Sequence, residues 1–81
     1  MTIKVLGPGC ANCRRLEIQT RRALEALGQE ADVVKVQDIE SIMAYGILRT
    51  PGLVVDEHVV SSGRVPSVSE ITTMISDAGL N

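Results

Sequence analysis

Hydrophobic and polar positions alternate at the start of the chain and then change to a helical spacing. Ile3 and Val5 alternate with their neighbours over residues 2–6, which predicts a short strand. The glycine and proline residues at positions 7–9 end that strand. Apolar positions recur every three or four residues from Ala11 to Leu27, and Gly28 follows as a C-terminal stop. The pattern therefore predicts a strand, a turn and a helix, in that order.

Further elements follow in the middle of the chain. The valine-rich residues 31–36 predict a second strand, so the first 37 residues make a βαβ unit with a parallel strand pair. Asp38 is placed to cap a shorter helix that Gly46 ends. Two short apolar runs, 53–55 and 58–60, flank Asp56-Glu57 and predict a hairpin, although Glu57 is a poor residue for a positive φ.

The C-terminal segment carries the signature of a capped helix. Ser67 and Glu70 have the spacing of a capping box. An apolar stripe follows at helical spacing, made of Ile71, Met74, Ile75 and Ala78. We expect Gly79 to end this helix and Leu80 to fold back on Ile75. Met43 and Met74 fall on the apolar faces of their helices, and we expect both in the core.

Composition narrows the class of protein. The 81 residues suit one domain spanning 1–81, with 44% hydrophobic and 22% charged residues. A net charge of −2 and a single aromatic residue, Tyr45, give no basis for binding nucleic acid or an anionic membrane. No apolar run approaches the roughly 18 residues of a transmembrane helix. The first residues lack the features of a secretory signal, so we expect a cytoplasmic protein.

The two cysteines form a single C-x-x-C motif, Cys10-Ala11-Asn12-Cys13, at the predicted start of the first helix. A disulfide framework would need more cysteines, and a tetrahedral zinc site would need two further ligands where the chain has one histidine, His58. We therefore expect a redox dithiol and no metal. The helix N-terminus favours a Cys10 thiolate, and Arg14 adds positive charge if its side chain folds back. Cys13, one turn further, is placed to resolve a mixed disulfide.

Three segments together resemble the thioredoxin superfamily, in its small, glutaredoxin-sized single-domain branch. They are Gly7 to Cys13 after a strand, Thr50-Pro51 before a hairpin, and Ser61-Ser62-Gly63 before a capped helix. The resemblance implies an α/β fold, βαβαββα, with a central four-stranded mixed sheet flanked by helices. It also implies a thiol–disulfide oxidoreductase in which Cys10 attacks, Cys13 resolves, and a cis-Pro51 faces the disulfide.

Three further residues support the site. Gly9, like Gly7, is expected to keep the approach to Cys10 free of side chains, Arg14 adds positive charge, and Thr50 precedes the proline that the resemblance places at the sulfurs. The expected partners are protein disulfides and either a reductase or a small-thiol electron donor, with no cofactor, and we expect a monomer. Lys4 stands six residues before Cys10, where thioredoxins place a buried acid on the preceding strand.

A heavy-metal-associated domain, a βαββαβ module that carries copper, is the alternative. It also places C-x-x-C after its first strand, its second helix is similar to residues 75–80, and Cu(I) suits two thiolates. That module usually has Met two residues before its first cysteine, where this chain has Pro8, and it has a strand after its last helix. Thr50-Pro51 has no role in it. The sequence therefore favours the oxidoreductase.

Overall fold

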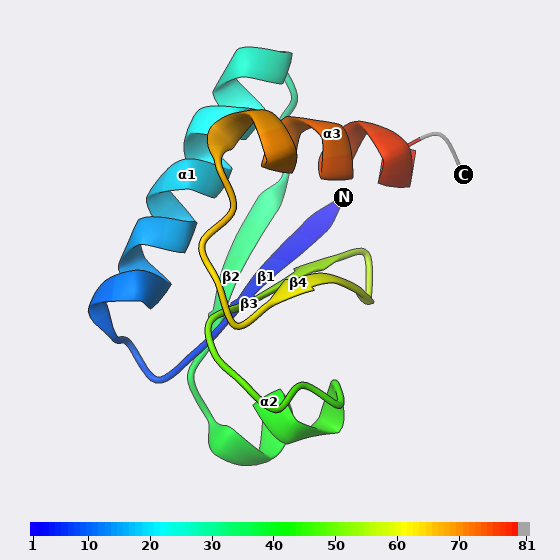
Figure 1. The fold of residues 1–81 in the computed structure, drawn as a ribbon. Coiled ribbons are helices and arrows are strands. Elements are labelled where there is room, and N and C mark those ends of the chain that lie inside the picture. The colour runs from blue at the N-terminus through cyan, green and yellow to red at the C-terminus, as the bar shows by residue number, and fades with distance from the viewer. Residues whose placement is uncertain (80–81) are drawn as a thin grey trace.

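Four strands form one mixed sheet in the order β2-β1-β3-β4 in the computed structural model, which describes residues 1–79 (Figure 1). The elements run in the order β1 Thr2–Leu6, α1 Ala11–Leu27, β2 Asp32–Val36, α2 Ile39–Ala44, β3 Gly52–Val55, β4 His58–Ser62 and α3 Val68–Gly79. The predicted βαβαββα fold with a four-stranded mixed sheet is confirmed. Within residues 1–79, no helix is long and apolar enough to cross a membrane.

The strand register brings distant segments to one end of the sheet. β1 pairs in parallel with β2, through the crossover helix α1, and antiparallel with β3, which pairs antiparallel with β4. Leu6, the last residue of β1, lies opposite both Val36 and Gly52, and Gly52 lies opposite Ser62. The loops that follow β1, β2 and β4, and the loop that precedes β3, therefore meet at this end.

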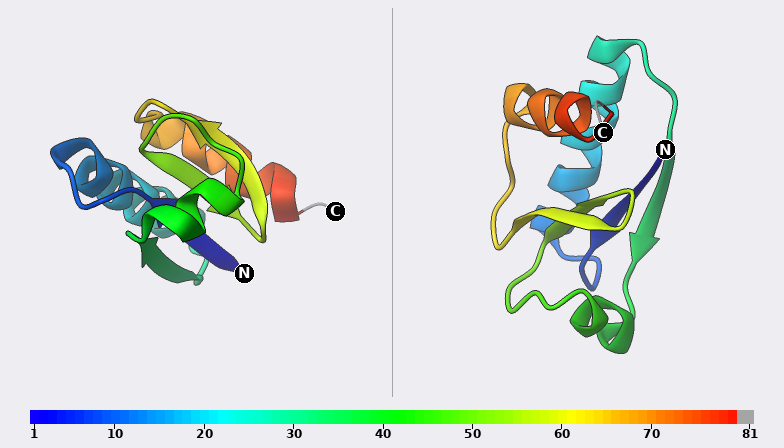
Figure 2. Two further views of the ribbon diagram at one scale, coloured as in Figure 1. Left: turned by 90° about the horizontal axis from the view of Figure 1, so that it is seen from below. Right: turned by 90° about the vertical axis from the view of Figure 1, so that its right-hand side faces the viewer.

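Helices cover both faces of the sheet. On one face α1 and α3 pack together (Figures 1 and 2). The apolar stripes of both helices meet alternate residues of β1 and β3. The buried residues there are Ile3, Val5, Leu16, Ala23, Leu24, Leu53, Val55, Ile71 and Ile75. On the other face Leu6 and Val54 pack against Ile42 of α2. The core is therefore large under α1 and α3 and small under α2.

The predicted helix boundaries rest on short-range hydrogen bonds. Gly28 ends α1 with a left-handed φ of 62°, a conformation that glycine adopts without strain. The Asp38 carboxylate accepts a hydrogen bond from the Ser41 N–H at 2.9 Å and caps α2. At α3, the Glu70 N–H donates to Ser67 Oγ at 3.1 Å and the Ser67 N–H donates to Glu70 Oε1 at 3.3 Å. These contacts confirm the capping box.

Three local predictions need correction, and a fourth falls outside the described residues. Met43 is 67% exposed, because α2 is short and directs Ile42 into its small core, whereas Met74 packs against the main core as expected. β2 begins at Asp32, one residue later than predicted. Gly79 is still helical. The predicted fold-back of Leu80 lies outside the described residues.

The turn between β3 and β4 has positive φ at two non-glycine residues, 46° at Asp56 and 70° at Glu57. Both side chains make long-range contacts that hold this backbone. Asp56 Oδ1 accepts a hydrogen bond from the Thr2 N–H at 2.8 Å, and Glu57 Oε1 accepts one from Lys4 Nζ at 2.6 Å. Tertiary contacts therefore outweigh the poor turn propensity of Glu57.

Candidate active site

Three loops converge at the end of the sheet where β1 finishes. The loop of residues 7–10 follows β1, and the Gly7 N–H donates to the Val36 carbonyl at 2.9 Å. The loop of residues 49–51 precedes β3, and the loop of residues 63–67 follows β4. The Gly63 N–H donates to the Pro51 carbonyl at 2.9 Å and ties these two loops together. Backbone hydrogen bonds thus anchor the surroundings of the C-x-x-C motif to the sheet.

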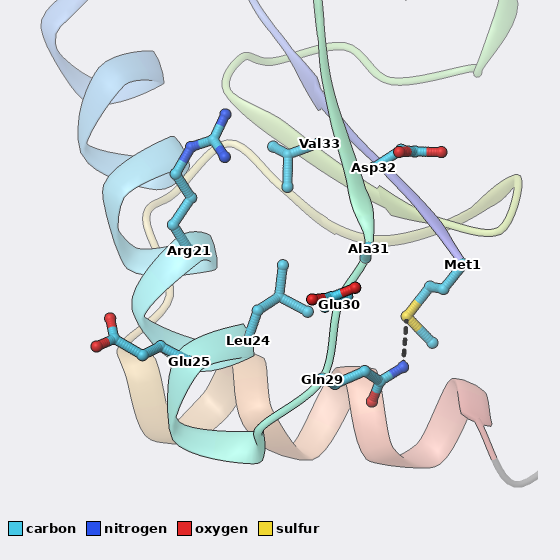
Figure 3. A pocket seen from close by; sticks show the side chains of 9 residues that line it. All are labelled: Met1, Arg21, Leu24, Glu25, Gln29, Glu30, Ala31, Asp32 and Val33. Carbon is cyan, nitrogen blue, oxygen red and sulfur yellow. Dashed lines mark hydrogen bonds between the residues drawn. The ribbon is translucent and has the colours of Figure 1, made fainter.

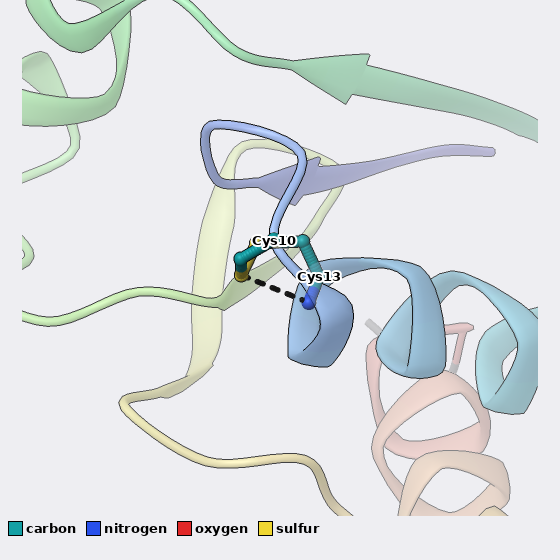
Figure 4. The surroundings of a disulfide bond; sticks show 2 residues. All are labelled: Cys10 and Cys13. Carbon is teal, nitrogen blue, oxygen red and sulfur yellow. Dashed lines mark hydrogen bonds between the residues drawn. A yellow bond between two sulfur atoms is a disulfide. The ribbon is translucent and has the colours of Figure 1, made fainter.

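Cys10 and Cys13 form a disulfide at the N-terminus of α1 (Figure 4). Cys10 is the N-cap residue, and its Sγ accepts a hydrogen bond from the Cys13 N–H at 3.2 Å. The Cys10 side chain is exposed, whereas Cys13 is only 5% exposed and lies inside the first turn. One sulfur therefore faces solvent and the other lies behind it.

The helix N-terminus determines which sulfur carries negative charge more easily when the disulfide is reduced. N–H groups of a first helical turn have no carbonyl partner within the helix, and the helix dipole is positive there. Cys10 Sγ already accepts a hydrogen bond from one of these groups, the Cys13 N–H. A thiolate at Cys10 is therefore favoured, and the thiolate is the nucleophile in disulfide exchange.

Two glycines before the motif have separate roles. A Cβ on Gly7 would overlap Cys13 Sγ and lie 3.3 Å from Cys13 Cβ. Gly9 has a φ of +90°, and a Cβ on it would lie 3.3 Å from Gln37 Nε2. The sequence interpretation assigned both glycines to an open approach to Cys10. The structure gives Gly7 a different role, because its missing side chain makes room for the buried sulfur.

The Thr50–Pro51 peptide bond is cis, and Pro51 is buried. Thr50 Cβ lies 3.8 Å from the position that a Cβ on Gly7 would take. Thr50 is therefore a neighbour of the glycine that borders Cys13. That the ring of Pro51 faces the sulfurs stays a prediction.

A cavity of about 230 Å³ lies beside Cys13. The residues that line it are Val5, Gly7, Gly9, Cys13, Arg14, Lys35 and Gln37. Arg14 therefore lines the same cavity as Cys13. The sequence interpretation had instead assigned its charge to Cys10. Lys35 and Gln37 were missed, although the parallel pairing that places Lys35 opposite Val5 follows from the predicted βαβ unit. None of the described residues that line this cavity carries a carboxylate.

Lys4 lies away from this cavity. Its Nζ donates to Tyr45 OH at 2.7 Å and to Glu57 Oε1 at 2.6 Å, on the face of the sheet that α2 covers. The hydrogen bond to Glu57, and then that to Tyr45, raise the pKa of Lys4 above its ordinary value. The same two partners lower the pKa of Glu57. The cluster joins β1, the end of α2 and the β3–β4 turn.

An apolar groove of about 230 Å³ begins at the loop that precedes Cys10. Its lining residues are Pro8, Ile39, Ile42, Met43, Ile47, Leu48, Arg49 and Thr50. Ile39, Met43 and Leu48 are 65%, 67% and 99% exposed. Pro8 and Thr50 belong both to this apolar groove and to the loops around the disulfide, so the groove continues the surface next to the disulfide.

A wider depression of about 570 Å³ lies at the opposite end of the sheet (Figure 3). It is formed by the C-terminal part of α1, the start of β2 and Met1, whose Sδ accepts a hydrogen bond from Gln29 Nε2 at 3.4 Å. Arg21, Glu25 and Asp32 also line it. The described lining contains no cysteine, so the redox chemistry belongs to the other end.

Comparison with known proteins agrees with this geometry. The family model described as a thioredoxin domain matches residues 1–76. A thioredoxin of Methanothermobacter thermautotrophicus is 40% identical over 76 residues, which cover 94% of this chain and 99% of that protein. A thioredoxin of Methanocaldococcus jannaschii is 37% identical over 71 residues, which cover 88% of this chain and 81% of that protein.

The chain belongs to the thioredoxin family, as the resemblance indicated. It is a thiol–disulfide oxidoreductase with a redox-active disulfide, and its partners are in general protein disulfides and a reductase. The copper-carrying alternative is not supported. Its βαββαβ order has two strands between its helices, whereas here α2 lies between β2 and β3.

Proposed function

We propose that Cys10 is the attacking cysteine and Cys13 the resolving cysteine of this oxidoreductase. The observation that carries the proposal is the difference in exposure between two bonded sulfurs at one helix N-terminus. Cys10 Sγ is accessible to a partner and accepts the Cys13 N–H, whereas Cys13 is enclosed by Gly7 and the first turn of α1.

The reaction proceeds in two exchanges. The Cys10 thiolate attacks one sulfur of a partner disulfide, and the second partner sulfur leaves as a thiolate with the electron pair. A bond now joins Cys10 to the partner. The Cys13 thiolate then attacks Cys10 Sγ, the first partner sulfur leaves as a thiolate, and the Cys10–Cys13 disulfide forms. The partner gains two electrons, and the reductase or small thiol that reduces Cys10–Cys13 supplies them again.

We further propose that folded protein disulfides dock on the loops at Pro8 and Thr50 and on the apolar groove. The large exposure of Met43 and Leu48 beside the site supports this docking surface. We also propose that the protein acts as a monomer and that it acts in the cytoplasm. Two cysteines that both belong to the redox motif suit a compartment where thiols are kept reduced.

Trapping of the mixed disulfide tests the assignment of the two cysteines. The reduced Cys13→Ser variant, mixed with insulin as a protein disulfide, accumulates a covalent Cys10–insulin complex because no second thiol resolves it. The matched Cys10→Ser variant forms no such complex. A Cys10→Ser variant that forms mixed disulfides as fast as the wild type overturns the assignment.

A further inference from the structure

The cavity beside Cys13 has a distinctive charge. Arg14 and Lys35 line it, and Gln37 adds an amide. The other lining residues have no charged side chain, and Cys13 becomes anionic only as a thiolate. The environment of the buried cysteine is therefore cationic, in a chain whose net charge is −2.

Lys35 is held at this cavity by the sheet register and by an ion pair. Its partner in the parallel pairing is Val5, whose side chain faces α1 in the main core, so Lys35 projects toward the same helix. Lys35 Nζ lies 3.3 Å from Glu17 Oε1, and Glu17 is four residues after Cys13 on α1. Arg14 directly follows Cys13 on the same helix. Two elements therefore each contribute one cation.

A buried thiolate needs such a partner. Burial raises the free energy of a charged group, and a nearby opposite charge lowers it. Cys13 has to be ionised when it attacks Cys10, and it leaves as a thiolate when an electron donor opens the Cys10–Cys13 disulfide. We propose that Arg14 and Lys35 stabilise the Cys13 thiolate through this cavity, and that Glu17 moderates the effect by pairing with Lys35. This inference rests on the proposed resolving role of Cys13.

The signs of the expected effects follow from the charges around Cys13. α1 contributes Arg14 and Glu17, β2 contributes Lys35, and Cys10 contributes a negative charge when it is a thiolate. Val5 of β1, Gly7 of the loop of residues 7–10 and Thr50 of the loop of residues 49–51 are uncharged. Burial opposes ionisation of Glu17, but hydrogen bonds from Arg21 and Lys35 outweigh it and lower its pKa, so Glu17 is anionic at neutral pH.

A titration of Cys13 alone tests the proposal. In a Cys10→Ala background, which removes the coupled thiol, the ultraviolet absorbance of the Cys13 thiolate is followed against pH. Arg14→Met and Lys35→Met each raise the Cys13 pKa by about half a pH unit, the size expected of a partly solvated charge. Glu17→Gln lowers it, because it removes the anion beside Lys35. Lys35→Arg restores the wild-type value.

Arg15→Met is the matched control. Arg15 carries the same charge one residue further along α1, and it borders a different depression with Ile18 and Val65. It therefore leaves the Cys13 pKa unchanged. Shifts for Arg14→Met and Lys35→Met that do not exceed the shift for Arg15→Met overturn the proposal, as does a rise in the Cys13 pKa with Glu17→Gln.

A kinetic measurement in the two-cysteine protein separates charge from structure. Lys35→Met slows resolution of the Cys10–insulin mixed disulfide about twofold to threefold near neutral pH, and the difference vanishes at alkaline pH, where Cys13 is ionised in both proteins. A rate that is reduced equally at every pH contradicts the proposal. Because trapping by Cys13→Ser does not depend on these charges, failure of the titration leaves the assignment of Cys10 intact.

Discussion

The α-carbon of Gly7 faces the sulfur of Cys13, and the space between them holds no side chain. A Cβ built on Gly7 would overlap Cys13 Sγ, with Cys13 Cβ at 3.3 Å. The sulfur cannot rotate away freely, because it is bonded to Cys10. The contact joins the end of β1 to the first turn of α1, so it sets the position of the buried cysteine.

Gly7→Ala is therefore expected to displace Cys13 and destabilise the oxidised protein by about 1–3 kcal/mol, the usual cost of overpacking a core. Denaturant unfolding of the oxidised and reduced proteins measures this change in the free energy of unfolding. We expect the larger decrease in the oxidised form. Pro8→Ala, at the exposed neighbouring position, serves as the control. Equal stability of Gly7→Ala and the wild type would show that this close approach is unimportant.

Glu57→Gln is expected to destabilise the protein near neutral pH. Because Lys4 and then Tyr45 lower the pKa of Glu57 from its ordinary value of 4.5, its ionised form stabilises the fold above that value, and this contribution is lost as the pH falls through the lowered pKa. Because the pKa of Lys4 is raised, the stabilisation from its charge is fully present below pH 10.5. This stabilisation is lost as the pH rises through the raised pKa.

Denaturant midpoints measured against pH check this prediction. The gap between the wild type and Glu57→Gln stays constant between about pH 6 and pH 9 and narrows at about pH 3. A gap that widens on acidification contradicts the assignment.

Lys4→Met, which removes the other member of the pair, leaves the titration of both cysteines unchanged, since Lys4 lies against Tyr45 and Glu57.

Met43→Ser and Leu48→Ser separate docking from chemistry. Both side chains are largely exposed in the apolar groove, so each substitution changes stability by no more than about 0.5 kcal/mol. Each variant is expected to react more slowly with the disulfides of a folded protein and at the wild-type rate with a small aromatic disulfide. Val34→Ser, an exposed apolar site on the edge strand β2, is the control. Equal loss with both substrates would place the defect at the cysteines.

Local signals predicted much of the fold. The strand of residues 2–6, the helix of residues 11–27 and the three helix starts follow from spacing and capping residues that act over a few positions. Cys10 at the N-cap combines such a local signal with the chemistry of the motif. These features need no knowledge of the tertiary structure.

Features that depend on strand order were missed or misassigned. The apolar spacing of α2 predicted a buried Met43, but the small core on that face holds Ile42 and leaves Met43 in solvent. The direction of Lys4 depends on which face α2 covers. Lys35 becomes a neighbour of Cys13 only through the register that sets it opposite Val5, with α1 above both strands.

The identity of the attacking cysteine is tested most directly by labelling the reduced wild-type protein. Less than one equivalent of iodoacetamide is added near neutral pH, and fragment mass spectrometry of the peptide that contains both cysteines locates the label. We expect the label on Cys10, because this sulfur is exposed at the helix N-terminus whereas Cys13 is only 5% exposed. A label on Cys13, or an equal distribution between the two cysteines, would contradict it.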